Sequence, residues 1–215
     1  FRWRRFSMHT KVVLTMSVAL TVGGAVIFRI TEDMPWIGAL FNSVTARTAG
    51  FSTYSLGEFS NAGLLAMIFL MFVGASPGST GGGIKTSTLF ALIQGIKTAA
   101  TNTSGKAFHY SVPHGVFRKA SVIAVMGISV IAVGTFMLCA FEPDIAIRDA
   151  LFEMTSAFGT VGLTTGITTG LGTASKLLSI VIMYIGRLGP LTIATLWYFT
   201  NGERTRYPDG NIAIG

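Results

Sequence analysis

The chain has 215 residues, of which 50% are hydrophobic and only 12% are charged, and its mean hydropathy is +0.61. Because soluble domains carry about 25% charged residues, this composition excludes an ordinary soluble domain. The net charge of +7 does not predict nucleic-acid binding, because the basic residues cluster at 2–11, 97–119 and 204–206 and most acidic residues lie between these clusters. That alternation is typical of a multi-pass protein of the cell membrane whose basic segments and C-terminus are cytoplasmic.

Apolar runs long enough to cross a membrane recur along the chain. Residues 12–28 and 120–141 contain no charge, and about 17–25 apolar residues suffice for a membrane-spanning helix. Residues 177–198 form a third run, interrupted only by Arg187, and residues 62–75 begin a fourth. The first residue is Phe1 rather than methionine, so we expect the chain to be part of a longer protein.

A shorter apolar stretch follows each of the runs 12–28 and 120–141, at residues 36–46 and 145–158, on the side of the membrane opposite the basic clusters. Stretches of 10–14 residues are too short to span the membrane and are typical of re-entrant half-helices. Each runs into small and hydroxylic residues that leave the helix. Backbone of that kind is tolerated at membrane depth only where it is packed in protein or lines a cavity.

The two halves of the chain form an internal repeat. A shift of 112 residues aligns Thr48 with Thr160 and Gly50 with Gly162, and the register continues into the following apolar run. We therefore predict an all-α membrane protein built from two units, residues 1–111 and 112–215. Each unit reads helix, pore helix, filter loop and helix.

The Thr-x-Gly tripeptide at the end of each half-helix predicts an ion selectivity filter. A dehydrated potassium ion needs rings of carbonyl oxygens in place of its water shell, and glycine accepts the backbone angles that aim those carbonyls inward. The predicted ion-binding residues are Thr48, Ala49, Gly50, Thr160, Val161 and Gly162. The sequence contains no pairing of a nucleophile with a base and no Cys/His cluster, so we expect neither an enzyme nor a transition-metal site.

Residues 74–86 break the second helix of the first unit with Pro77 and three consecutive glycines. Each glycine costs a helix about 1 kcal/mol and proline about 3. A nucleotide-binding P-loop is an alternative, but Ile84 intrudes before Lys85 and Thr86, and no soluble strand precedes the segment. A static kink also remains open.

Arg187 lies within the third apolar run, where an arginine costs about 2.5–3.5 kcal/mol on insertion scales and usually faces the interior of the bundle. Two interpretations stand: a structural charge paired with carbonyls or a carboxylate, or a fixed charge near the cation path that anchors the broken segment.

Three motifs, TARTAGFST at 45–53, GASPGSTGGGIKT at 74–86 and GRLGPLT at 186–192, resemble the Trk/Ktr/HKT potassium-transporter superfamily. The closing RYPDG at 206–210 is most similar to the membrane subunit of bacterial Ktr systems. The resemblance covers the whole chain as the third and fourth of four repeats, so this chain would hold half of a filter.

The resemblance implies a flexible intramembrane loop that gates the pore beneath the filter. The gate residues it implies are Gly78, Ser79, Thr80, Gly81, Gly82, Gly83, Lys85 and Arg187. It also implies a homodimer of pore subunits in membrane lipid, resting on a cytoplasmic ring of regulatory proteins. The transported ion would be K+, with Na+ as a second candidate, and a nucleotide would bind only to the regulatory partner.

Two other classes of protein fit the same residues. A two-repeat potassium channel subunit could complete its pore by dimerisation, and a non-conducting scaffold would leave the glycines of both loops without a role. Glu153, in the second half-helix, could attract cations or form a packed, hydrogen-bonded contact. The outer acidic residues could enrich cations at the pore mouth or be solvated loop charges; they are Glu32, Asp33, Glu142, Asp144 and Asp149.

Overall fold

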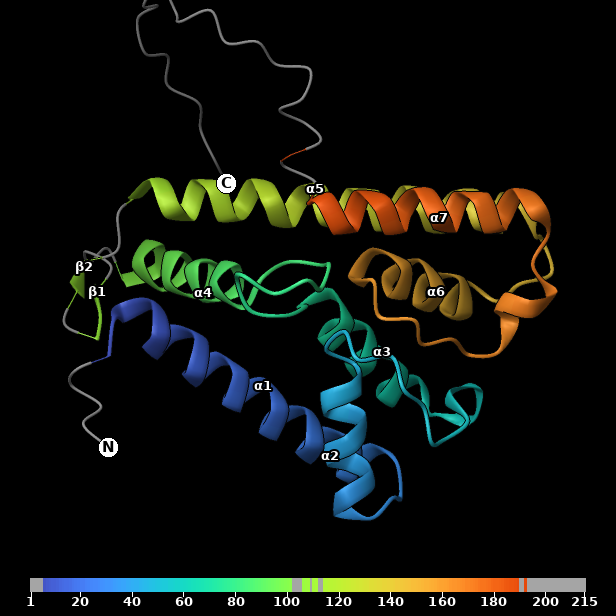
Figure 1. Cartoon of the computed structure of the whole chain (residues 1–215), viewed down its shortest axis with the longest axis horizontal. Helices are drawn as coiled ribbons and strands as arrows, with labels where there is room; N and C mark the ends of the chain where they lie inside the picture. The colour runs from blue at the N-terminus through green and yellow to red at the C-terminus, as the bar shows by residue number, and fades with distance from the viewer. Residues whose placement is uncertain (1–5, 102–105, 109, 112–113, 190–191, 193–215) are drawn as a thin grey trace, which may run out of the picture.

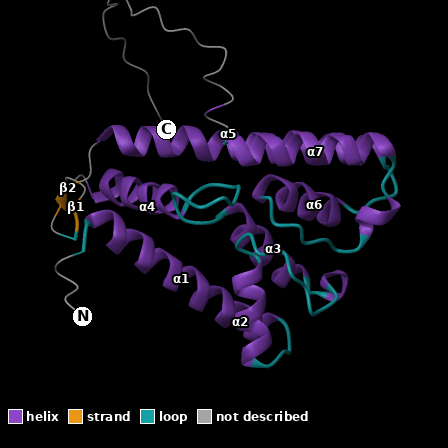
Figure 2. Cartoon of the chain, viewed as in Figure 1, coloured by secondary structure: helices purple, strands orange, loops and turns teal. Residues whose placement is uncertain are grey.

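The computed structural model describes residues 6–101, 106–108, 110–111, 114–189 and 192. Within these residues the regular secondary structure is helical, except for one pair of two-residue strands, β1 and β2, which pair antiparallel between α4 and α5 (Figures 1 and 2). The elements are α1 (Met8–Thr31), α2 (Trp36–Thr45), η2 (Leu56–Glu58), α3 (Asn61–Phe72), α4 (Thr86–Thr101), β1 (Lys106–Ala107), β2 (Tyr110–Ser111), α5 (His114–Phe141), α6 (Ile147–Gly159), η3 (Ile167–Gly170) and α7 (Thr173–Leu188).

Two of the described helices, α1 and α5, are long and apolar enough to cross a membrane. Ser7 caps α1 by accepting a hydrogen bond from the amide of Thr10 at 3.2 Å. Both helices expose many of their aliphatic side chains; Ile30 of α1 is 77% exposed and Phe136 of α5 is 76% exposed. An apolar surface of this kind suits a lipid environment better than water.

The short apolar stretches fall on α2 and α6, of 10 and 13 residues. Neither helix has a side-chain N-cap, and α6 ends where Thr160 enters the left-handed region at φ 52°. The second helix of the first unit is interrupted, since α3 ends at Phe72 and α4 begins at Thr86.

One predicted helix ends earlier than its apolar run. The run continues to residue 198, whereas α7 ends at Leu188 and Gly189 follows with φ 86°. Glycine adopts this left-handed conformation without the steric cost that other residues meet, and it therefore commonly terminates helices. Most of the run after Gly189 lies outside the described residues.

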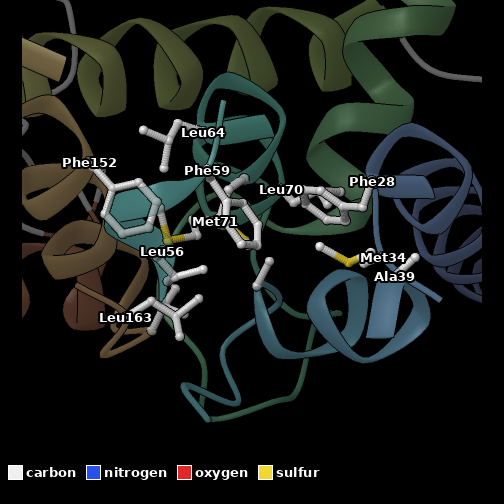
Figure 3. Packing of buried hydrophobic residues seen from close by; sticks show 13 residues of the cluster. Phe28, Met34, Ala39, Leu56, Phe59, Leu64, Leu70, Met71, Phe152 and Leu163 are labelled. Atoms are coloured by element: carbon white, nitrogen blue, oxygen red, sulfur yellow. The ribbon is translucent and has the colours of Figure 1, made fainter. Parts of the chain in front are cut away.

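The hydrophobic core joins the two halves of the chain. Helix α1 packs on α2 and α3, α5 packs on α6 and α7, and α3 crosses between them to contact α6. Figure 3 shows Phe28 and Met34 of the first half on one side of this cluster, Phe152 of the second half on the other, and Met71 between them. The segments that follow α2 and α6 are thereby held near one another at the centre of the molecule.

Candidate functional site

The two Thr-x-Gly segments share an unusual backbone conformation. Thr48 and Gly50 have φ of 75° and 78°, and Thr160 and Gly162 have φ of 52° and 93°. Among the described residues other than glycine, only Phe108 also has a positive φ. L-residues rarely adopt this region, and they cluster in it at functional sites. Residues that lie 112 positions apart in the two segments therefore have the same backbone conformation.

Backbone hydrogen bonds tie each segment to the end of its half-helix. The amide of Gly50 donates to the carbonyl of Thr45 at 3.2 Å, and the amide of Val161 donates to the carbonyl of Ser156 at 2.9 Å. The two segments are also adjacent, because a Cβ added to Gly50 would meet the carbonyl oxygen of Val161. The structure thus brings the two predicted filter segments together, 112 residues apart in sequence.

The glycine loop, residues 73–85, connects α3 to α4. Its two ends lie side by side, since the amide of Ile84 donates to the carbonyl of Phe72 at 3.0 Å. Gly83 turns the chain at φ 71°, packed against the same Phe72 carbonyl. The segment is therefore a loop whose two ends meet, and not a bend in one continuous helix.

The glycine loop contacts the threonine of both filter segments. The amide of Gly82 donates to the hydroxyl of Thr160 at 2.8 Å. A Cβ added to Gly81 would lie 2.7 Å from the hydroxyl oxygen of Thr48, so the side-chain-free backbone is what permits the contact. In Figures 1 and 2 the loop runs from α4 toward α6, whose end carries Thr160.

Two basic side chains hold successive carbonyls of this loop. Arg187 of α7 donates from Nη1 to the carbonyl of Thr80, and Lys85 donates from Nζ to the carbonyl of Gly81. The tip of the loop, Gly78 to Thr80, is exposed, whereas Gly82 is buried. Arg187 therefore pairs with a loop carbonyl, a contact common to both interpretations of that residue.

Glu153 is buried in α6 and hydrogen-bonded rather than solvated. Its side chain is 8% exposed, and Oε1 accepts from the hydroxyls of Thr164 and, at 2.9 Å, Thr168. Both threonines follow the second filter segment. Burying a carboxylate is costly unless it is hydrogen-bonded, and these bonds link the half-helix to the chain that leaves the filter.

Two outer carboxylates that the sequence presents as loop charges cap helices instead. Glu32, directly after α1, accepts from the amide and hydroxyl of Ser60, the N-cap of α3, at 3.1 and 2.6 Å. Glu142, directly after α5, accepts from the amide of Gly172, the N-cap of α7, at 2.7 Å and from the hydroxyl of Ser175 at 2.9 Å. These bonds, that from Gly172 above all, lower the pKa of Glu142.

This arrangement corrects the interpretation of Glu32 and Glu142 as solvated loop charges. A helix N-terminus presents unpaired amides and a positive dipole end that attract a carboxylate. The sequence did contain a sign of this shared role. Glu32 and Glu142 occupy equivalent positions, because each is the first residue after the long helix of its half of the chain.

Arg47 is a site residue that the motif analysis missed. It precedes Thr48, and its Nη1 donates to the carbonyl of Ser17 at 3.1 Å and to the hydroxyl of Thr21 at 3.2 Å, both on α1. The first filter segment is thereby fixed to the long helix of its own unit. The signal was a charge inside an otherwise uncharged loop, the same signal that marked Arg187.

The chain matches known cation transporters over nearly its whole length. The family model TrkH, described as a cation transport protein, matches residues 6–201. Ktr system potassium uptake protein B of Bacillus subtilis is 34% identical, over 100% of this chain and 51% of that protein. Potassium/sodium uptake protein NtpJ of Enterococcus hirae is also 34% identical, over 100% of this chain and 51% of that protein.

A solved structure has the same fold. The crystal structure of the potassium transporter TrkH from Vibrio parahaemolyticus superimposes with a TM-score of 0.71 at 20% identity, covering 88% of this chain and 44% of that one. The chain therefore spans about half the length of the relatives it matches. These matches confirm the resemblance drawn from the motifs, and the family that they show is one of cation transport proteins rather than of enzymes. The chain belongs to the TrkH family of cation transport proteins.

Proposed function

We propose that this chain is the third and fourth pore-loop repeats of a potassium uptake protein of the cell membrane. The observation that carries the proposal is the shared left-handed backbone of the two Thr-x-Gly segments, placed side by side above the glycine loop. Relatives named potassium uptake proteins support the choice of ion. The name of NtpJ, a potassium/sodium uptake protein, keeps Na+ as a second transported ion.

In this proposal the carbonyls of the two segments supply half of the ring that replaces the ion's hydration shell. Alternating left-handed residues turn successive carbonyls, and a filter needs several of them around one ion. Thr48, Ala49 and Gly50 supply one side, and Thr160, Val161 and Gly162 supply the next. Two preceding repeats of the same plan complete the pore.

The glycine loop is the gate in this proposal. It lies against both filter threonines and is held by Arg187 and Lys85, so it blocks the path in the conformation described here. A population shift to a displaced loop opens the path. Arg187 favours the closed state, because its guanidinium donates to a loop carbonyl.

The proposed assembly is a homodimer of four-repeat subunits, with basic segments on the cytoplasmic side facing a ring of nucleotide-binding regulatory proteins. The word "system" in the name of the Ktr relatives supports a partner component. A pull-down with the purified full-length membrane subunit is expected to recover a soluble nucleotide-binding protein, and recovery of none would contradict this part of the proposal.

Potassium uptake tests the function itself. The full-length protein that contains this chain, reconstituted into liposomes, is expected to take up K+ down its gradient and to exclude larger organic cations. A variant in which Gly50 and Gly162 are both replaced by serine serves as the filter control. Equal uptake by protein-free liposomes, or no uptake by correctly folded protein, would reject conduction and favour a scaffold.

A further inference from the structure

An apolar groove lies along the seam between the two halves of the chain. Its volume is about 790 Å³, and its walls come from α1, α3, α5 and α6. Eleven of the twelve lining residues are hydrophobic, and the twelfth, Thr155, donates its hydroxyl to the carbonyl of Leu151 at 2.8 Å. The groove therefore offers no polar group that needs a partner, and its lining suits a hydrocarbon chain better than water or an ion.

A cationic side chain lies next to one end of this groove. Arg148 is in the first turn of α6, one turn before the lining residue Leu151, and is exposed. Its Nη1 donates to the side-chain oxygen of Asn61 at 3.2 Å. Asn61 is the first residue of α3 and precedes the lining residue Ala62. The guanidinium thus joins the starts of α3 and α6, which both line the groove.

The guanidinium also retains capacity for a ligand. Its Nε lies 3.7 Å from the carboxylate of Asp149, and no protein partner is found for Nη2 within the described part of the chain. Arginine binds phosphate through its planar fork of donors. A phosphate beside Arg148 would stand at the head of the groove, with its acyl chain running along α3 and α6.

We propose that this seam binds one phospholipid, its phosphate on Arg148 and one acyl chain in the groove. The groove has a charged group at one end and an apolar lining along its length. This combination suits a phospholipid better than a peptide, because the backbone amides of a peptide would find no hydrogen-bond partner there. All twelve lining residues of the groove belong to this chain. Leu65 of α3 and Ile128 of α5, both lining residues, are 64% and 57% exposed and would contact the acyl chain. The proposal rests on the membrane location that family membership gives, and not on ion conduction.

Photolabelling of the full-length transporter in liposomes tests this site. The probe is phosphatidylglycerol with a photoreactive diazirine in one acyl chain, and labelled positions are mapped by peptide mass spectrometry. Groove residues Leu65 and Ile128 are expected to be labelled several-fold more than Phe136, which lies on α5 outside the groove. Equal labelling of the three residues would mean ordinary annular lipid and would overturn the proposal.

Two variants separate the headgroup contact from the groove. Arg148→Gln is expected to reduce labelling of the groove about five-fold, as for loss of one exposed charge pair. Arg29→Gln is the matched control, because Arg29 is a partly exposed arginine near an aspartate, Asp33 at 3.6 Å, and is not among the residues that line this groove. Its labelling is expected to equal wild type. Ala132→Trp, which fills the apolar groove, is expected to abolish groove labelling although Arg148 is unchanged.

Three results would reject the phospholipid: groove labelling unchanged by Arg148→Gln, labelling reduced equally by Arg29→Gln, or groove residues cross-linked to a second copy of the protein. Arg148 is at the surface and its variant is expected to fold, so the test stands even if Ala132→Trp does not fold.

Discussion

Thr48 and Thr160 are held in a backbone conformation that costs about 1–3 kcal/mol in residues with a Cβ. The cost is met by the hydrogen bonds that tie each segment to its half-helix and, for Thr160, by the amide of Gly82. Backbone strain that recurs at two equivalent positions supports the proposal that these segments have a functional role. In the proposed function that role is to orient carbonyl oxygens toward a bound cation.

Serine at the filter glycines is expected to relax discrimination of potassium over sodium. Both glycines have positive φ, so a Cβ strains each segment, and the hydroxyl adds a harder, closer ligand. The two sites differ, because a Cβ at Gly50 also meets the carbonyl of Val161 whereas one at Gly162 meets nothing within 4 Å. Gly50→Ser should therefore have the larger effect on the sodium-to-potassium permeability ratio of the full-length transporter.

The outcome that contradicts the filter is unchanged sodium permeability in both variants at wild-type expression and size-exclusion behaviour. A loss of all flux with normal folding would instead mean that the segments are structural supports and not the ion path.

At the scale of elements, the glycine loop is fixed by contacts that can be removed one at a time. Gly82 has no left-handed φ, so alanine is compatible with its backbone, but the added Cβ would lie 2.8 Å from the carbonyl oxygen of Phe158. Gly82→Ala is therefore expected to displace the loop without breaking α3 or α4.

If the loop closes the pore, Gly82→Ala should raise potassium flux about two- to ten-fold, since one hydrogen bond contributes about 0.5–1.5 kcal/mol. Gly170→Ala is the matched control, because a Cβ there meets nothing within 4 Å and the residue has no positive φ. Flux lowered by Gly82→Ala and unchanged by the control would favour a static kink.

Deleting residues 78–83 is a stronger form of the same change. It is expected to raise flux and weaken control by the regulatory partner while leaving potassium selectivity largely intact. Arg187→Ala should act in the same direction with a smaller effect, because it removes only the contact to Thr80. Uptake into proteoliposomes at matched protein incorporation measures both, and reduced uptake in both variants would reject the gate.

The cap that Glu142 places on α7 predicts a pH dependence. Hydrogen bonds from Gly172 and Ser175 lower the pKa of this carboxyl. The charged form is therefore favoured in the folded state, and its stabilisation is present above the unfolded pKa of about 4.5 and is lost as pH falls through the folded value. Glu142→Gln keeps an acceptor but not the charge, so the difference in melting temperature between wild type and variant should shrink below about pH 4. A difference that is constant from pH 7 to 3 would mean that the charge contributes nothing.

At the scale of the whole molecule, one of the two hydrophobic clusters contains residues from both halves of the chain. Phe152 of α6 is fully buried in the cluster that also contains Phe28 of α1 and Met71 of α3 (Figure 3). We expect this shared cluster to hold the two Thr-x-Gly segments in a fixed relative position, as the proposed filter requires.

Phe152→Ala should therefore destabilise the protein by about 3–5 kcal/mol, the range for truncating a buried phenylalanine. Phe136→Ala, at a position 76% exposed on α5, is the control and should change the melting temperature little. Thermal unfolding in detergent measures both, and equal shifts would show that the halves do not share a core.

The sequence by itself predicted a membrane protein of helical fold and the approximate position of most of the described helices. The length of an apolar run and the position of a glycine are local properties, and local properties decide where a helix can form and where it breaks. Residues 36–46 and 145–158 thus fall on α2 and α6, and the glycines of 74–86 fall between α3 and α4. Gly189 shows the limit of this reasoning, because hydropathy continued past a helix end that one left-handed residue sets.

Only the tertiary structure decided which distant groups meet. Glu32 reaches Ser60 across 28 residues and Arg187 reaches Thr80 across 107, and no local pattern encodes such pairings. The same holds for the groove beside Arg148, which forms only once α3 and α6 pack together. A buried polar group must find its partner within the folded chain, and the partner's identity follows from the packing of helices rather than from the residue's neighbours in sequence.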